Sequence, residues 1–440
     1  MTVSQHQSMA EYLKNAPMYS PGATEDVRRT VFEMLTCIER DGADAIRAYS
    51  RELDGWDPPS FIVDELTVEQ AEDALTPELR RHIAGAQRNV REFAQAQRAT
   101  LADLEVEIAP GVTLGHRHIA VETVGAYVPG GRYPMLASSF MTVIVPKVAG
   151  VGRVIACAPP RAGAGIDPAM LYAMATSGAD HILCLGGVQA LAAMAFGIED
   201  LAPADMLVGA GNAYVAEAKR QLFGKVGIDL LAGPTEVAVI ADEHADAELI
   251  AADLLGQAEH GPNSPAVLIT TSRHQGEAVI KQVERLLETW PTREVAGAAW
   301  DAHGSVVVAA DRDEAIALSD KIAPEHLEVQ VLDAELDYYL THLRNYGSLF
   351  LGEQATVAYG DKGVGTNHVL PTMGAARYTG GLWVGKFLKT CTFQRLTDEG
   401  TKRIAPTIAA IAEAEHFEGH ALTATMRLDR LAEHAASART

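Results

Sequence analysis

Two side chains in the segment GQAEHGP, residues 256–262, have the types and the spacing of metal ligands. Gln257 and His260 lie three residues apart near the end of a predicted helix, so their side chains share one face of it. A neutral imidazole is a common zinc ligand, and an amide is a rarer one. For this pair taken alone, a polar helix end beside the turn at Gly261 and Pro262 is the simpler explanation.

Glu325 and His326 are adjacent in a predicted loop, between the helix pattern DEAIALSDKIA and the strand pattern LEVQV. Loops that join regular elements often carry function. A carboxylate beside an imidazole can move protons, one acting on the substrate and one on a water molecule. A solvated pair is the alternative for these two residues taken alone.

Asp361 and His420 extend the set of candidate ligands. Asp361 lies in the glycine-rich segment AYGDKGVGTNHVLPT, and His420 lies five residues after Glu415 in the helical segment AEAEHFEGHAL. Each can be an ordinary surface group. Together with Gln257 and His260 they would form a set of nitrogen and oxygen donors that suits zinc.

The elements that must position these residues change in character along the chain. Residues 24–120 carry apolar residues at helical spacing. From Glu122 onward, short β-branched runs alternate with alanine-rich helical stretches, in two successive series. This alternation predicts an α/β fold with two doubly wound parallel sheets and a ligand cleft between them. From about residue 379 the pattern returns to helix and loop.

Two glycine clusters have some features of nucleotide-binding loops. One spans residues 163–165 after the strand pattern RVIACAPP, and the other spans residues 209–211 after DMLV. Both lack the third glycine of the GxGxxG pattern, so neither indicates a dinucleotide by itself. A tight turn explains each cluster equally well.

Composition argues against several classes of function. The 440 residues are 48% hydrophobic and 21% charged, which is typical of a globular protein with two or more domains. The formal net charge is −22 and no block of Lys or Arg occurs, so we expect neither nucleic acid nor a membrane as the main partner. A small anion needs only one or two local cations. The four dispersed cysteines, and the lack of a signal-peptide pattern or membrane-length apolar run, favour the cytoplasm.

Eight segments that follow one another along most of the chain resemble the signatures of the histidinol dehydrogenase family. They are VGAYVPGG, GGVQALAAMAFG, GAGNAYVAEAKRQ, LAGPTEVAVIAD, DLLGQAEHGP, APEHLEVQ, GSLFLGE and GTNHVLP. The resemblance implies two incomplete Rossmann-like domains with small helical terminal extensions, in an intertwined homodimer. We therefore expect an N-terminal extension at 1–23, a discontinuous α/β domain at 24–121 and 237–378 with most zinc and catalytic residues, a second, NAD-side Rossmann-like domain at 122–236, and a C-terminal helical extension at 379–440.

The resemblance also implies a role for individual residues. These are ligation of one Zn²⁺ per subunit by Gln257, His260, Asp361 and His420, catalysis by Glu325 and His326, and contact with NAD⁺ by Tyr127, Gln189 and Asn212. The family reaction oxidises a primary alcohol through an aldehyde to a carboxylate and uses two NAD⁺ in turn. Zinc would hold the substrate, His326 would accept the hydroxyl proton as hydride leaves, and a water deprotonated near Glu325 would add to the aldehyde.

The resemblance does not fix the substrate, because this chain departs from the histidinol pattern. Thr235 stands in GPTE where serine is usual, and Arg132 and Tyr133 follow YVPGG where small residues are usual. The segment AARYTGGLWVGKFLKTCTFQ at 375–394 resembles the branch of the family that oxidises 2,3-dihydroxypropane-1-sulfonate to sulfolactate. The sequence of this segment favours a small anionic alcohol as the substrate.

A sulfonate needs charge-assisted hydrogen-bond donors. The candidate substrate contacts are Thr235, Asn367, His368, Arg377 and Glu415, with Lys386 and Arg132 as further cations. Each of these cations can equally be a solvated surface group. The alternatives are a histidinol dehydrogenase of histidine biosynthesis and a zinc-binding homologue that has lost catalysis.

Overall fold

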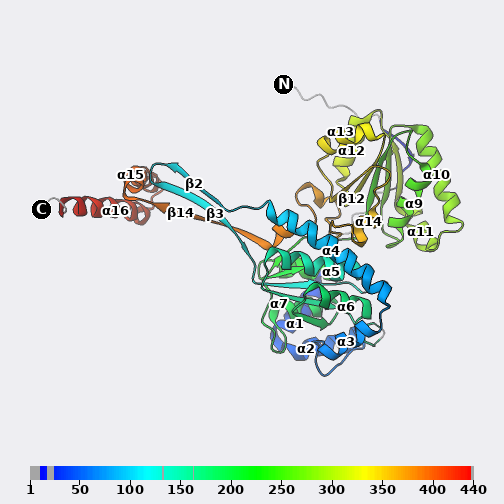
Figure 1. Cartoon of the computed structure of the whole chain (residues 1–440), viewed down its shortest axis with the longest axis horizontal. Helices are drawn as coiled ribbons and strands as arrows, with labels where there is room; N and C mark the ends of the chain where they lie inside the picture. Colours follow the sequence, from blue (N-terminus) through cyan, green and yellow to red (C-terminus); the bar gives the residue numbers. More distant parts are fainter. Residues whose placement is uncertain (1–9, 17–23, 131–132, 162, 438–440) are drawn as a thin grey trace. The chain divides into compact units, whose positions relative to one another are not determined.

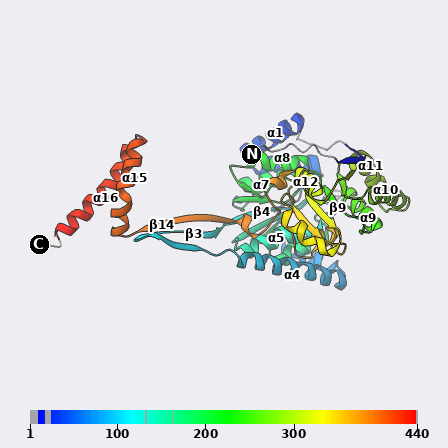
Figure 2. The ribbon, with the colours of Figure 1, turned by 90° about the horizontal axis from the view of Figure 1, so that it is seen from above.

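The computed structural model describes residues 10–16, 24–130, 133–161 and 163–437. The chain forms two compact units. Unit 1 comprises Met1–Gln97 and Val121–Phe387, and unit 2 comprises Arg98–Ala120 and Leu388–Thr440 (Figures 1 and 2). Arg132 and most of the expected N-terminal extension lie outside the described residues.

A six-stranded sheet forms one half of unit 1. Its strands in spatial order are β1 (Glu11–Lys14), β11 (Gly304–Val308), β10 (Ala266–Thr270), β9 (Val237–Ala241), β12 (His326–Gln330) and β13 (Ser348–Leu351). All neighbouring strands are parallel except β1, which pairs antiparallel with β11. The five parallel strands grow outward in both directions from β9, which is the doubly wound order that the sequence predicts.

Helices cover both faces of this sheet. The helices are α9 (Ala247–Ala258), α10 (Arg273–Leu287), α11 (Arg293–His303), α12 (Arg312–Ile322), α13 (Leu336–His342) and α14 (Val357–Lys362). Helices α9, α10 and α11 share one apolar core with the sheet, and α12 and α13 share the core on its other face (Figure 1). Strand β9 reads VAVIA and is buried throughout, as expected for a parallel strand that is covered on both faces.

A five-stranded parallel sheet forms the other half of unit 1. Its order is β6 (His181–Cys184), β5 (Arg153–Ala158), β4 (Thr123–Tyr127), β7 (Met206–Val208) and β8 (Gly227–Ile228). Along the chain, β4 is followed by α5 (Leu136–Ala149), β5 by α6 (Pro168–Ser177), β6 by α7 (Gly187–Phe196) and β7 by α8 (Ala213–Leu222). The order changes direction between β4 and β7, which is where ligands bind in sheets of this kind.

The helical segment before β4 packs mainly with this second sheet. It contains α1 (Glu25–Asp41), α2 (Ala43–Tyr49), the π-helix η1 (Ser50–Asp54), α3 (Glu65–Asp73) and α4 (Pro77–Ala99). Apolar residues of α1 and α2 lie in one core with residues of β5, β6, α7 and α8. This packing differs from the sequence expectation, which grouped 24–121 with 237–378. An amphipathic pattern shows that a helix face is buried, but it does not identify the partner.

Unit 2 is a three-stranded antiparallel sheet followed by two helices. The strands are ordered β14 (Leu388–Leu396), β3 (Val112–Ala120) and β2 (Leu104–Ala109), and the helices are α15 (Asp398–Ala414) and α16 (Glu418–Ser437). Figure 2 shows the two helices as a pair, and their shared core consists mainly of alanine. The expected helical extension at 379–440 therefore begins instead with the short 3₁₀ helix η4 (Val384–Phe387) and strand β14.

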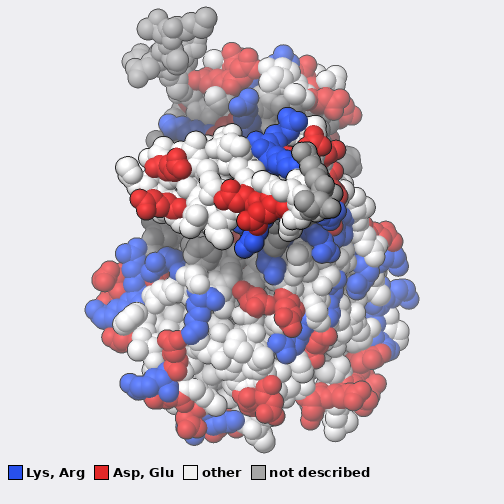
Figure 3. Space-filling model, turned by 90° about the vertical axis from the view of Figure 1, so that its left-hand side faces the viewer, with Lys and Arg blue, Asp and Glu red and all other residues white. Residues whose placement is uncertain are grey.

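Surface charges are interspersed rather than concentrated. On the face drawn in Figure 3, Lys and Arg side chains alternate with Asp and Glu, and no extended basic surface is visible there. No helix in the described parts of the chain combines the length and apolar character needed to cross a membrane.

Candidate active site

His326, the first residue of β12, is buried among acidic groups. Its Nδ1 lies 3.1 Å from the carbonyl oxygen of Glu236 and 3.4 Å from Oε2 of Glu325. Its Nε2 lies 3.2 Å from Oδ1 of Asp361. Burial disfavours the charged imidazole, but Glu325 and Asp361 outweigh it and raise the pKa of His326 well above its ordinary value. The predicted proton-transfer pair thus lies against a predicted metal ligand.

Thr235 connects the predicted catalytic carboxylate with another predicted ligand. Its hydroxyl donates to Oε2 of Glu325 at 2.5 Å and accepts a hydrogen bond from Nε2 of Gln257. The backbone N–H of Glu236 donates to the same Glu325 oxygen at 3.0 Å. Strands β9 and β12 are parallel neighbours whose first residues pair, so the residues just before them meet at one edge of the sheet.

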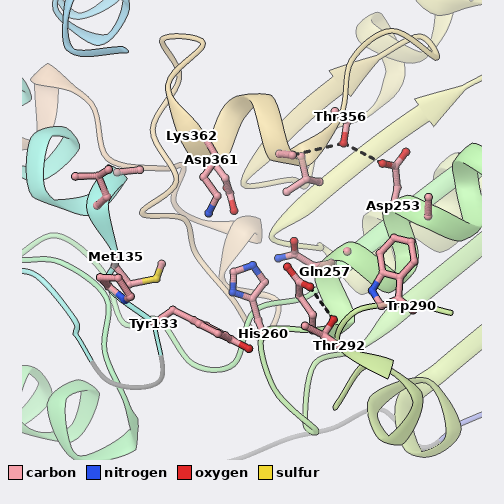
Figure 4. Close-up of a pocket in the computed structure, with 18 residues that line it drawn as sticks. Tyr133, Met135, Asp253, Gln257, His260, Trp290, Thr292, Thr356, Asp361 and Lys362 are labelled. Atoms are coloured by element: carbon pink, nitrogen blue, oxygen red, sulfur yellow. Dashed lines mark hydrogen bonds between the residues drawn. The ribbon is translucent and has the colours of Figure 1, made fainter. Parts of the chain in front are cut away.

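A cavity of about 540 Å³ brings three predicted zinc ligands together (Figure 4). Gln257 belongs to α9, His260 follows that helix, and Asp361 belongs to α14. Burial lowers the pKa of His260, which favours the neutral imidazole that metals bind. Burial would raise the pKa of Asp361, but the hydrogen bond from His326 holds it at about 2, so the carboxylate is ionised.

These three side chains supply an amide, an imidazole and a carboxylate, which is a donor set that fits zinc. Among the described residues, no three or more His, Cys, Asp and Glu side chains form a metal-binding group. Of the predicted ligands that line the cavity, His260 and Asp361 are of these types, and the third is the amide of Gln257. The predicted fourth ligand, His420, lies exposed in α16 of unit 2, and Glu415 lies exposed just after α15.

The three predicted NAD⁺ contacts line a second cavity of about 460 Å³, at the carboxyl ends of strands of the five-stranded sheet. The Tyr127 hydroxyl accepts a hydrogen bond from Gly187 N, and Asn212 caps α8. Nε2 of Gln189 donates to Asp54 at 2.8 Å, while its Oε1 is buried with no partner among the described residues. That oxygen leaves an acceptor for a ligand.

A buried ion pair fixes the turn after β7 beside this cavity. Lys219 and Asp229 pair inside the protein, and the Lys219 ammonium also donates to the carbonyl of Gly209 at 2.8 Å. Asp229 accepts from the N–H of Gly209 at 2.8 Å. A Cβ on Gly209, which has φ +112°, would lie 2.0 Å from the carbonyl oxygen of Tyr127, so this glycine permits the close approach. The sequence analysis left open whether the glycine cluster at 209–211 forms a nucleotide-binding loop or a tight turn.

Two predicted substrate contacts bind the protein itself. His368 approaches the Ser138 hydroxyl through Nε2 at 2.7 Å and the Asp361 carbonyl through Nδ1 at 3.0 Å. Asn367 donates to the carbonyl of Met141 at 3.2 Å and accepts from the N–H of Val369. Both side chains therefore attach the loop after α14 to residues of α5.

The predicted cations lie elsewhere. Arg377 is exposed in the 3₁₀ helix η3 (Ala375–Arg377), and Lys386 donates to the Thr379 hydroxyl at 2.5 Å. Among the described residues that line the 540 Å³ cavity, neither of these two cations occurs.

Two charged residues at the site were missed by the sequence analysis. Lys362 lines the cavity next to Asp361, and Figure 4 shows both side chains extending from the same short helix. Glu236 accepts from the N–H of Met373 at 3.1 Å, and burial together with the charge of Glu325 raises its pKa to about 7. Lys362 directly follows Asp361, and Glu236 directly follows Thr235. This adjacency to two predicted site residues is the sequence signal that could have identified them.

Comparison with known proteins identifies the family. Residues 20–428 match the model of the histidinol dehydrogenase family. A histidinol dehydrogenase homolog from Shouchella clausii is 51% identical over 96% of this chain and 99% of its own length. A sulfopropanediol 3-dehydrogenase from Ruegeria pomeroyi is 48% identical over 95% of this chain and 96% of its own length.

A solved structure gives the same assignment for the fold. The crystal structure of histidinol dehydrogenase from Elizabethkingia anophelis superposes with a TM-score of 0.89 at 33% identity, covering 94% of this chain and 95% of that one. This confirms the predicted α/β fold with parallel sheets. The chain belongs to the histidinol dehydrogenase family and is an NAD-dependent dehydrogenase of its two-step, alcohol-to-acid type.

Proposed function

We propose that this enzyme is zinc-dependent and oxidises a small anionic primary alcohol, 2,3-dihydroxypropane-1-sulfonate, to 3-sulfolactate in sulfonate catabolism. The observation that carries the anionic class is Lys362, which lines the cavity of the predicted metal ligands. Among the described residues its ammonium makes no hydrogen bond or ion pair. A divalent metal ion and a free ammonium in one cavity would attract an anionic substrate. The sulfopropanediol dehydrogenase among the relatives supports the same class.

Gln257, His260, Asp361 and His420 would hold the metal. When bound, zinc supplies Lewis acidity and orients the hydroxyl-bearing carbon. In its neutral form His326 would take the hydroxyl proton and NAD⁺ would accept the hydride, so that the alcohol becomes the aldehyde and the proton is held at His326. Glu325 takes a proton from water, whose oxygen adds to the aldehyde carbon. A second NAD⁺ would accept the hydride of the hydrated aldehyde, and the acid so formed would lose its proton to His326 once that residue has released the first one, which leaves the carboxylate.

We also propose that the protein is an intertwined homodimer. Unit 2 has a small alanine core but exposes many large apolar side chains. These are Leu104, Val106, Ile108, Ile119, Leu396, Ile408, Ile411, Phe417, Leu422 and Met426. A second copy would cover such a surface, because exposed apolar groups of this extent are unusual on a monomer.

A substrate assay tests the proposed reaction. Zinc-loaded protein is offered NAD⁺ with each enantiomer of 2,3-dihydroxypropane-1-sulfonate and, separately, with L-histidinol, and NADH is followed. We expect two NADH per molecule of one sulfonate enantiomer. Turnover of histidinol alone would reject the sulfonate and favour the histidine-biosynthesis alternative. No turnover of either compound would reject the sulfonate as well, and would favour another alcohol or a zinc-binding homologue without activity.

Mixed dimers test how the site is shared. The variants His326→Asn and His420→Ala are each expected to be inactive. If one copy supplies His420 to the other, a mixed dimer has one site with both native residues and regains up to half of the activity per dimer. If each chain uses its own His420, both sites stay defective and the mixture remains inactive.

A further inference from the structure

Two carboxyl groups beside the site, one buried and one partly buried, have no role in the reaction described above. Glu328 lies on β12 and is 0% exposed, and Asp253 lies on α9 and lines the 540 Å³ cavity. The two carboxyl groups hydrogen-bond to each other. Nε2 of Gln330 donates to both of them, at 2.9 Å to Asp253 and 3.0 Å to Glu328. Burial and the charge of Asp253 raise the pKa of Glu328 to about 8, so this pair holds a proton at neutral pH.

The pair connects elements that carry site residues. Strand residues two apart point to the same face, so Glu328 lies on the face of β12 that also presents His326. On α9, Asp253 precedes Gln257 by four residues and His260 by seven, so it shares their helix face. The pair therefore links the strand of the proposed base to the helix of two proposed ligands.

The same two carboxyl groups hold the beginning of α14. Oε1 of Glu328 accepts the N–H of Val357, the first residue of that helix, at 3.0 Å. Thr356, the N-cap residue, donates its hydroxyl to Asp253 at 2.9 Å and accepts the N–H of Ala358. Helix α14 has only six residues, and a helix this short is not stable without tertiary anchors.

We infer that Asp253 and Glu328 are positioning residues for the proposed metal site. They fix α14, which carries Asp361, against α9, which carries Gln257 and is followed by His260. The inference rests on the proposed zinc site. Groups that orient metal ligands change metal affinity when they are altered, even though they do not touch the ion.

Zinc affinity tests the inference independently of turnover. The dissociation constant is measured by competition with a chromophoric chelator for the wild-type protein and for Glu328→Gln, Glu328→Ala, Thr356→Val and Val329→Ala. In Glu328→Gln the amide oxygen still accepts from Val357, the amide nitrogen can donate to Asp253, and Gln330 keeps its hydrogen bond to Asp253, so we expect affinity within about threefold of wild type. Glu328→Ala and Thr356→Val should weaken zinc binding by about 10- to 100-fold.

Val329→Ala is the matched control, because Val329 lies on the opposite face of β12 in the core with α12 and α13. It should lower stability without changing zinc affinity. The near-isosteric Thr356→Val carries the test if Glu328→Ala does not fold. Wild-type affinity in Thr356→Val and in any folded Glu328→Ala would overturn the positioning role. Absence of zinc binding by the wild-type protein would instead reject the proposed metal site, and the inference with it.

Discussion

Replacing Glu328 by glutamine should stabilise the six-stranded half of unit 1 relative to the wild type, and this gain should grow as the pH rises. Burial and the neighbouring charge of Asp253 raise the pKa of Glu328 to about 8, from an ordinary value of 4.5. Below pH 4.5 both the folded and the unfolded chain hold the proton. Between 4.5 and 8 the folded chain keeps it while the unfolded chain loses it, so wild-type stability falls with pH throughout this window.

The magnitude follows from one proton. Each pH unit within the window changes the free energy of unfolding by about 1.4 kcal/mol per proton. Glutamine does not titrate and keeps the hydrogen bonds to Asp253 and Val357. The variant should therefore gain up to about 3 kcal/mol on the wild type between pH 5.5 and 7.5.

Urea unfolding followed by tryptophan fluorescence measures this gain. Trp300 is buried in the core of the six-stranded half and Trp290 packs against it, so both report on this region. Wild type and variant are compared at equal zinc content, because metal binding is itself pH-dependent. Val329→Ala should shift the unfolding midpoint equally at all pH values. A difference between Glu328→Gln and wild type that stays constant from pH 5.5 to 7.5 would refute the shared proton.

Three further predictions concern the charged groups around the site. Lys362→Met should raise KM for the anionic alcohol by about 10- to 100-fold, as expected for loss of a charge-assisted hydrogen bond, and leave KM for NAD⁺ unchanged; an unchanged substrate KM would remove Lys362 from the substrate site. Lys219→Met should destabilise the protein by about 3–5 kcal/mol in urea unfolding and weaken NAD⁺ binding, because Asp229 is left buried without its partner; normal stability would contradict this. Glu236→Gln should remove a step near pH 7 from the pH profile of kcat/KM, because the wild-type carboxyl ionises there beside Glu325. An identical step in that variant would assign the titration to another group.

The elements with regular periodicity could be predicted from the sequence. Buried runs such as VAVIA alternate with helices, and this alternation led to two doubly wound parallel sheets. Strand β14 was missed because all nine of its residues, LKTCTFQRL, are exposed or only partly covered, so the sequence lacks the alternation that marks a half-buried strand. The partner of the α1 and α2 helices was also missed, because it depends on contacts between distant segments.

Within the candidate site, sequence spacing predicted the geometry only of residues that lie close together in one helix. The three-residue separation of Gln257 and His260 placed them on one helix face, and both line one cavity with Asp361. Contacts between residues on neighbouring strands could not be predicted in this way, because sequence spacing does not show which strands pair. Lys362 follows a selected residue directly, but a single lysine in a glycine-rich loop does not differ from a solvated one until the loop is folded.

Chain connectivity constrains how the two cavities of unit 1 work together. Tyr127 ends β4 and lines the 460 Å³ cavity, whereas Tyr133 lines the 540 Å³ cavity. Six residues of extended chain span at most about 22 Å, so the segment 127–133 limits the distance between the two tyrosine backbones. Hydride transfer needs the reacting carbons of alcohol and cofactor in contact. Substitutions in the described residues of this connection, 128–130 and Tyr133, should therefore affect kcat more than the binding of either ligand alone.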